Sequence, residues 1–159
     1  METFSNPAAC DIRIDKEGTW YFRGAEMFRK EIVNFLYQHL KRDKDGRYLI
    51  ELGEDRCHID VEDTAFVVSA VLQPTVADGV AGESLELLLS DGTAEQLDAT
   101  TLRIGKDNIP YCSVKNHLFD ARFSRAGYYQ LAHFIRNDSE RDAYYILLNG
   151  TSHYIRRIV

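Results

Sequence analysis

The chain has 159 residues, of which 45% are hydrophobic and 28% charged, and its formal net charge is −6. This composition excludes a globally disordered chain, and no apolar run approaches the ~18 residues that a membrane-spanning helix needs. The first residues have neither the positive charge nor the apolar core of a signal peptide. A net acidic protein is also a poor general nucleic-acid binder. We therefore expect one globular domain, or two small ones.

The cysteines and histidines argue against a metal site. Cys10, Cys57 and Cys112 are odd in number, far apart and without Cys-x-x-Cys spacing, which also argues against a disulfide framework and favours a reducing compartment. The five histidines show no paired metal-ligand spacing. We therefore expect no metal, no cofactor and a cytoplasmic protein.

Charge is distributed unevenly along the chain. Residues 1–50 carry a net charge of +1, residues 51–98 a net charge of −11 and residues 101–159 a net charge of +4. Charge runs usually form solvated faces, so the acidic middle segment is either such a face or a docking surface for a basic partner. The basic last third favours a compact anionic ligand there.

The first half is predicted to form hairpin, helix and hairpin. Residues 1–10 are expected to form a loose arm. Two β-prone runs, 12–14 and 20–22, flank a turn that ends at Gly18. Apolar residues spaced three or four apart over 26–40 predict an amphipathic helix, and the runs 48–52 and 57–61 predict a second hairpin.

The middle of the chain is predicted to supply further strands. Residues 64–72 are almost continuously apolar and rich in valine, which is typical of a buried central strand. A loop over 74–82 should follow, then a strand over 85–89, a turn at Asp91-Gly92 and a short strand over 94–98.

From Leu102 onward, the pattern of the first half returns. Corresponding residues lie 90 positions apart up to Tyr111 and 96 positions apart from Arg125 onward, and a steady offset is typical of repeated supersecondary units. The change of offset predicts a six-residue insertion in a polar elbow over 115–123. We therefore expect a duplicated α+β fold with a mostly antiparallel sheet. Its N-terminal repeat should span 1–63 and its C-terminal repeat 64–159, with bridging strands in 64–100.

Three cations, Lys115, Arg122 and Arg125, lie close together in this acidic chain. Arg29 and Arg125 each fall near a predicted helix start, where a cation opposes the helix dipole and free amides favour anions. Each arginine then either completes an anion site or pairs with an acidic neighbour. Tyr111 lies on the strand before Lys115, which places it among the ligand-binding candidates.

Two further residues have alternative interpretations. Trp20 either stacks on a ligand or anchors the core, and Cys112 has the position of a small buried residue. No set of acid, base and nucleophile is visible, and no Gly-rich phosphate loop occurs. We therefore expect no catalytic activity.

The order and spacing of several motifs resemble a bacterial family of unknown function, domain-of-unknown-function family 1285. The matching pieces are Ile12-Arg-Ile-Asp-x-x-Gly-Thr-Trp20, Arg42-Asp43-x-x-Gly46-x-Tyr48, Pro110-Tyr111-x-x-Val114-Lys115 and Ala121-Arg122-x-x-Arg125. The resemblance implies a duplicated fold whose C-terminal half is pleckstrin-homology-like. It also implies a nucleotide-like ligand in the cleft between the two halves and a signalling role.

Two hypotheses about function follow. The first is a small cytosolic protein that holds an anionic, nucleotide-like molecule between the two repeats in a signalling role. Its ligand-binding residues would be Tyr111, Lys115, Arg122 and Arg125, with Arg29 and Trp20 as further candidates. The second is a protein–protein adaptor that uses the acidic middle segment and has no small-molecule ligand.

Overall fold

The computed structural model describes residues 8–74 and 84–158 of the chain. The fold is mixed α+β, with mostly antiparallel strands and two α-helices in the described residues. The chain divides into two compact units, Met1–Ala65 and Phe66–Val159.

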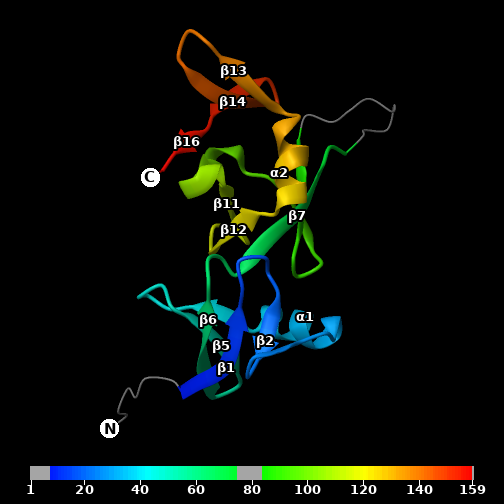
Figure 1. Ribbon diagram of the computed structural model, residues 1–159, viewed down its shortest axis with the longest axis vertical. Helices are drawn as coiled ribbons and strands as arrows, with labels where there is room; N and C mark the ends of the chain where they lie inside the picture. The colour runs from blue at the N-terminus through cyan, green and yellow to red at the C-terminus, as the bar shows by residue number, and fades with distance from the viewer. Residues whose placement is uncertain (1–7, 75–83, 159) are drawn as a thin grey trace. The chain divides into compact units, whose positions relative to one another are not determined.

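The described strands of the first unit form one six-stranded sheet in the order β3-β2-β1-β6-β5-β4 (Figure 1). The strands are β1 (Ala8–Ile14), β2 (Trp20–Phe22), β3 (Ala25–Glu26), β4 (Leu40–Arg42), β5 (Tyr48–Leu52) and β6 (Asp55–Val61). All neighbours are antiparallel except β1 and β6, which are parallel. Both predicted hairpins, β1–β2 and β5–β6, are confirmed. The expected arm was wrong for residues 8–10, because they form the start of β1.

Helix α1 (Lys30–Gln38) contacts this sheet through Tyr37, its buried residue. It begins later than the pattern predicted, because Ala25 and Glu26 pair with β2 as strand β3. The core includes Trp20, whose side chain is 1% exposed. Its ring makes an edge contact of 4.8 Å with Tyr37 of α1, and the Tyr37 hydroxyl donates to the Ala65 carbonyl. Trp20 therefore anchors the core, one of its two expected roles.

Cys10 of β1 and Cys57 of β6 form a disulfide, with their Cα atoms 5.1 Å apart. The expectation of no disulfide was therefore wrong. The two cysteines are 47 residues apart in sequence, and the parallel pairing of β1 with β6 brings them together. The argument from cysteines for a reducing compartment no longer holds. Cys112 is the remaining thiol, and it is completely buried.

In the second unit, seven described strands form a sheet in the order β16-β10-β11-β12-β7-β8-β9. They are β7 (Phe66–Leu72), β8 (Glu86–Leu89), β9 (Ala94–Gln96), β10 (Arg103–Ile104), β11 (Pro110–Val114), β12 (Phe119–Phe123) and β16 (Arg156–Arg157). The predicted central position of residues 64–72 is confirmed for β7, although Leu72 is 51% exposed. The predicted loop over 74–82 lies, apart from Pro74, outside the described residues.

A second, three-stranded sheet contains β13 (Ile135–Asp138), β14 (Ala143–Leu148) and β15 (Thr151–Tyr154). Two short 3₁₀ helices, η1 (Ala99–Thr101) and η2 (Lys106–Asn108), flank β10. Helix α2 (Arg125–Ala132) begins where the sequence predicted.

The predicted polar elbow over 115–123 was wrong, because most of it is strand β12. Residues Lys115, Asn116 and His117 have positive φ and form the turn of a β11–β12 hairpin. Phe119, Ala121 and Phe123 point to the buried side of the sheet. The alternation of these residues with Asp120 and Arg122 is typical of a strand.

Candidate functional site

The junction between β12 and α2 is fixed by Ser124. The Ser124 side chain is the N-cap of α2 and accepts a hydrogen bond from the Gly127 amide at 3.0 Å. The Ser124 amide donates to the Val68 carbonyl of β7 at 2.9 Å. Close contact of α2 with β7 requires Gly127, since a Cβ there would lie 2.6 Å from the Val68 carbonyl oxygen. These contacts fix the start of α2 against the sheet.

A pocket of about 390 Å³ lies at this junction, bounded by the end of β12, the start of α2 and the segment before β11. Its lining residues come from these three segments: Asp107, Asn108, Ile109, Pro110, Arg122, Phe123, Ser124, Arg125, Tyr128 and Tyr129. The lining is thus partly apolar and partly cationic.

The charge of this pocket favours anions. Two arginines and one carboxylate, Asp107, are among its lining residues, and the first turn of α2 has no acidic residue. Arg125 is exposed and has no ion-pair partner among the residues that the structure describes. It is the first residue of α2, where a cation opposes the helix dipole. A bound anion would offset this repulsion.

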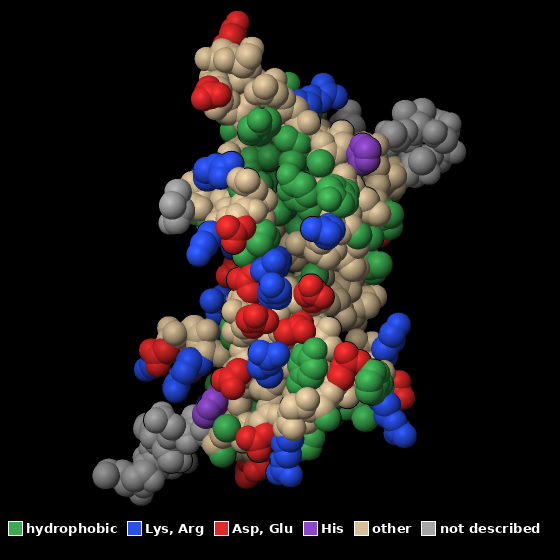
Figure 2. All heavy atoms as spheres, viewed as in Figure 1, with side chains coloured by type: hydrophobic (Ala, Val, Ile, Leu, Met, Phe, Trp, Pro, Cys, Tyr) green, Lys and Arg blue, Asp and Glu red, His purple; other side chains and the backbone are tan. Residues whose placement is uncertain are grey.

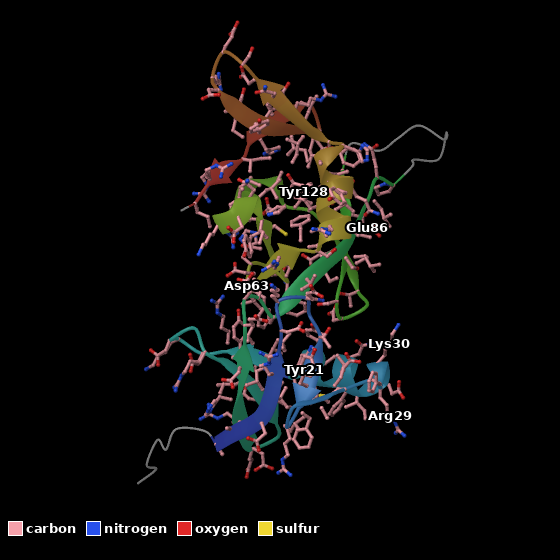
Figure 3. The ribbon with its side chains drawn as sticks, viewed as in Figure 1. Tyr21, Arg29, Lys30, Asp63, Glu86 and Tyr128 are labelled. Atoms are coloured by element: carbon pink, nitrogen blue, oxygen red, sulfur yellow. A yellow bond between two sulfur atoms is a disulfide. The ribbon has the colours of Figure 1, made fainter. Side chains whose placement is uncertain are left out.

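Two tyrosines supply flat surfaces to the same pocket. The rings of Tyr128 and Tyr129 lie 6.0 Å apart at 64°, and Tyr129 is 59% exposed. Figure 3 shows Tyr128 on the same helix that Arg125 starts. An aromatic ring of a ligand could stack on such a surface while its charged group contacts the arginines.

The structure does not bring Lys115 to this pocket. The Lys115 ammonium lies 2.8 Å from the Asp91 carboxylate and donates to the Thr93 hydroxyl at 2.7 Å. Its backbone amide donates to the carboxylate of Glu95. Burial raises the pKa of Asp91, but the hydrogen bonds from Lys115 and Thr93 outweigh it, so that this pKa lies below its ordinary value. Lys115 therefore joins the β11–β12 turn to the segment between β8 and β9.

Tyr111 is a neighbour of the pocket and not part of its lining. It pairs with Arg122 across β11 and β12. The Tyr111 ring packs against Gly105, where a Cβ would lie 2.8 Å from a ring carbon. Gly105 therefore holds the ring of Tyr111 beside β10.

The remaining two candidates, Trp20 and Arg29, belong to the first unit. Trp20 is buried in the core of that unit. Arg29 is the N-cap residue of α1, is exposed and makes no side-chain capping bond. Of the six predicted residues, Arg122 and Arg125 therefore share one pocket.

Sequence reasoning missed Ser124, Tyr128 and Tyr129 as pocket residues. The available signal was Ser124 directly before a predicted helix, because serine is a preferred N-cap residue. The tyrosines lie one turn further on, on the side of the helix that a ligand at its N-terminus would meet.

The acidic middle segment forms several contacts inside the second unit. Besides Asp91 and Glu95, Asp98 caps η1 by accepting from the Thr100 amide, and it also lies 2.8 Å from the His117 ring. Hydrogen bonds from Thr100 and then from His117 lower the pKa of Asp98. These three carboxylates therefore contribute to the fold.

Other chemistry has little support in the described residues. Burial raises the pKa of the Cys112 thiol to about 12, which keeps it protonated and unreactive. Within residues 8–74 and 84–158, no group of three metal-ligating side chains occurs. In the same residues, no helix has the length and apolar character of a membrane span.

The fold and pocket define a two-unit α+β protein with a cationic pocket at a helix start. Residues 5–64 match the family described as domain of unknown function (DUF1285), N-terminal domain. The family resemblance that the sequence predicted is therefore confirmed over residues 5–64, which are similar to the DUF1285 N-terminal domain.

Two solved structures share the fold. A DUF1285 family protein from Silicibacter pomeroyi DSS-3 has a TM-score of 0.75 and 20% identity, covering 94% of this chain and 83% of that one. A DUF1285 family protein from Shewanella baltica OS155 has a TM-score of 0.61 and 18% identity, covering 77% and 90%. No curated protein matches the chain.

Proposed function

We propose that the second unit binds a small anionic molecule, nucleotide-like in combining a phosphate with a planar ring, in the pocket at the start of α2. The protein would act by binding and not by catalysis, in the signalling role that the family resemblance implies. The observation that carries this proposal is Arg125, a cation without an ion-pair partner in the described part of the chain, beside Arg122 in a pocket of about 390 Å³.

Anionic chemistry fits this pocket better than neutral or cationic chemistry. The start of a helix attracts phosphates through its amides and its dipole, and arginine donates paired hydrogen bonds to phosphate oxygens. The position of Arg125 costs roughly 0.3–1 kcal/mol against the helix dipole. A phosphate on Arg125 and the first turn of α2 would remove that cost.

The tyrosines favour a ligand that carries a ring as well as a charge. The exposed face of Tyr129 and the half-buried Tyr128 follow Arg125 by about one turn. A ring stacked there would leave a phosphate within reach of the helix start, since one turn spans about 5.4 Å. Pro110 and Phe123 supply the apolar part of the lining.

A thermal-shift screen followed by titration tests the proposal. AMP, GMP and ATP should raise the melting temperature, because a ligand at 100 times its dissociation constant adds about 2.7 kcal/mol of stability. Arg125→Ala should weaken binding about 10- to 150-fold, which corresponds to about 1.5–3 kcal/mol for a charge-assisted hydrogen bond. Folding stability should remain nearly unaltered, because the change removes a charge from the unfavourable end of a helix.

Arg141→Ala is the matched control for this titration. Arg141 is an exposed arginine of the same unit that pairs with Asp138, and its loss should leave nucleotide affinity unchanged. The proposal is wrong if none of the three nucleotides shifts the melting temperature. It is also wrong if Arg125→Ala lowers stability sharply at unchanged affinity, because Arg125 would then brace the fold.

A further inference from the structure

Helix α1 of the first unit exposes an apolar stripe. Ile32 and Phe35 are three residues apart, so they lie on one side of the helix, and Phe28, which precedes the helix, lines the same groove as Ile32. The side chains of Phe28, Ile32 and Phe35 are 81%, 41% and 49% exposed. Phe22 of β2 is 44% exposed as well. Exposed apolar side chains that gather in this way mark interaction sites.

A groove of about 240 Å³ lies at the N-terminal end of this stripe. Its lining includes Phe22, Met27, Phe28 and Ile32. Phe35 is the one exposed apolar residue of the stripe outside the groove. Each copy of the first unit thus has an apolar groove at one end of the stripe and an aromatic side chain at the other.

Charges around the stripe suit a second copy of the same chain. Arg29 and Lys30 lie at the N-terminal end of α1 (Figure 3), and neither has an ion-pair partner among the described residues. The last turn of α1 has no basic residue, so its partial negative charge has no cation of its own helix beside it. Antiparallel pairing would place the two cations of one helix next to the last turn of the other.

The local charge is also nearly balanced. Glu26 lines the groove, and Glu31 lies in the first turn of α1, so two carboxylates accompany Arg29 and Lys30. Figure 2 shows both blue and red side chains beside green ones over the position of α1. A balanced surface does not select a strongly charged partner, whereas two identical copies can meet on it without net repulsion.

We propose that the α1 stripe is a homodimer contact in which two copies of α1 pair antiparallel about a two-fold axis near Ile32. Phe35 of each copy would enter the groove of the other, so that the same contact is made twice, as two-fold symmetry requires. Ile32 lies midway between Phe28 and Phe35 in sequence, and it would face its own counterpart at the axis. This inference is independent of ligand binding in the second unit.

Sedimentation equilibrium of the full chain, under conditions that keep the Cys10–Cys57 disulfide, tests the contact. The native chain should show a concentration-dependent dimer. Ile32→Asp should raise the dimer dissociation constant at least ~30-fold, the effect of losing a central interface residue. Leu118→Asp is the control, because Leu118 is 65% exposed in the β11–β12 turn and should leave the dimer unaltered.

Folding of each variant is checked by fluorescence of Trp20, the only tryptophan of the chain, which is buried against α1. A native chain that remains monomeric at about 1 mM overturns the proposal, since a specific contact binds more tightly than that. A folded Ile32→Asp variant that still dimerises like the native chain overturns it as well.

The antiparallel arrangement has its own test. Ile32→Cys should form a disulfide-linked dimer under mild oxidation, because two-fold symmetry brings the two substituted residues together. Leu118→Cys should not, and the buried Cys112 is inaccessible to cross-linking. Efficient cross-linking at position 118 and none at position 32 would show that the copies meet elsewhere.

Discussion

The segments β1–β2–β3–α1 of the first unit and β10–β11–β12–α2 of the second share their strand registers. The antiparallel pairs Arg13–Tyr21 and Ile14–Trp20 correspond, 90 positions later, to Arg103–Tyr111 and Ile104–Pro110. The pair Ile50–Cys57 corresponds, 96 positions later, to Ile146–His153. The first strand of each segment, β1 or β10, also pairs in parallel with a later strand, β6 or β16. These registers agree with the spacing of the predicted repeat; the duplication, and with it the superposition of residues 11–62 on 101–158, stays a prediction.

The two segments differ in the hairpin before the helix. Strand β3 has two residues and is an edge of its sheet, whereas β12 has five residues and pairs with β7 on its other side. The helix starts differ as well, since Ser124 caps α2 with its side chain and Arg29 makes no such bond. The greater length of β12 therefore lets the sheet of the second unit continue to β7. The first segment keeps an open edge and exposed phenylalanines, and the second has a cationic pocket.

The largest predicted effect concerns the disulfide, which only the first unit has among the described residues. Cys57→Ser should destabilise the first unit by about 4 kcal/mol, the loop-entropy contribution for two cysteines 47 residues apart. Trp20 fluorescence reports on the first unit alone, because Trp20 lies in its core. The denaturation midpoint measured by Trp20 fluorescence should fall in Cys57→Ser. The same midpoint should be unaltered in His153→Ser, which changes the corresponding position of the second unit. If Cys57→Ser had the same denaturation midpoint as the native chain, the disulfide would have no stabilising role.

The next prediction compares a substitution in α2, where the helix is in close contact with β7, with one at an exposed position of α1. Gly127→Ala should destabilise the second unit by about 1–3 kcal/mol, because the added Cβ would lie 2.6 Å from the backbone oxygen of Val68. Without this close contact, alanine would favour the helix by about 1 kcal/mol relative to glycine. The sign of the change in the free energy of unfolding therefore shows whether α2 and β7 are in close contact. Far-UV circular dichroism during urea unfolding measures it. Glu31→Ala, at an exposed position in the first turn of α1, should be nearly neutral. A stabilised Gly127→Ala variant would mean that α2 and β7 are not in close contact.

The sequence allowed prediction of those features that depend on neighbouring residues. The β1–β2 and β5–β6 hairpins follow from alternation and local turns, and the start of α2 follows from Ser124. Strand β12 was missed because its outward residues, Asp120 and Arg122, are polar. Its signal was the alternation of these residues with inward apolar ones.

Long-range pairing accounts for the other failures. The disulfide depends on a parallel pairing between β1 and β6 that neither strand specifies alone. At the candidate site, Arg122 and Arg125 were predictable because they are three residues apart. Lys115 was grouped with them by proximity in sequence, yet the β11–β12 turn directs it to Asp91, 24 residues earlier in the chain. Sequence distance alone gives no information about such a contact.

The third prediction uses the difference between the helix caps. Ser124→Ala should destabilise the second unit by about 1 kcal/mol, because the Gly127 amide loses its acceptor. Arg29→Ser should act in the opposite direction on the first unit, since it supplies a cap that α1 lacks. Urea unfolding followed by circular dichroism and by Trp20 fluorescence measures the two changes. If Arg29→Ser destabilises the first unit, Arg29 has a structural role that the cap comparison does not explain.

The smallest predicted effect is a pH dependence of the stability of the second unit, which contains the ion pair between Asp91 and Lys115. The first unit lacks this ion pair. Because hydrogen bonds keep the folded-state pKa of Asp91 below its ordinary value despite burial, its stabilising contribution is present above the unfolded pKa of about 3.9. That contribution is lost as the pH falls from about 3.9 through the lower folded value. The effect should be small, because burial acts against the hydrogen bonds.

Asp91→Asn should therefore make urea unfolding of the second unit less dependent on pH between about 5 and 2.5 than in the native chain. Asp60→Asn, at an exposed position of the first unit, is the control. Equal acid sensitivity of the native chain and Asp91→Asn would show that the ion pair with Lys115 contributes nothing to stability.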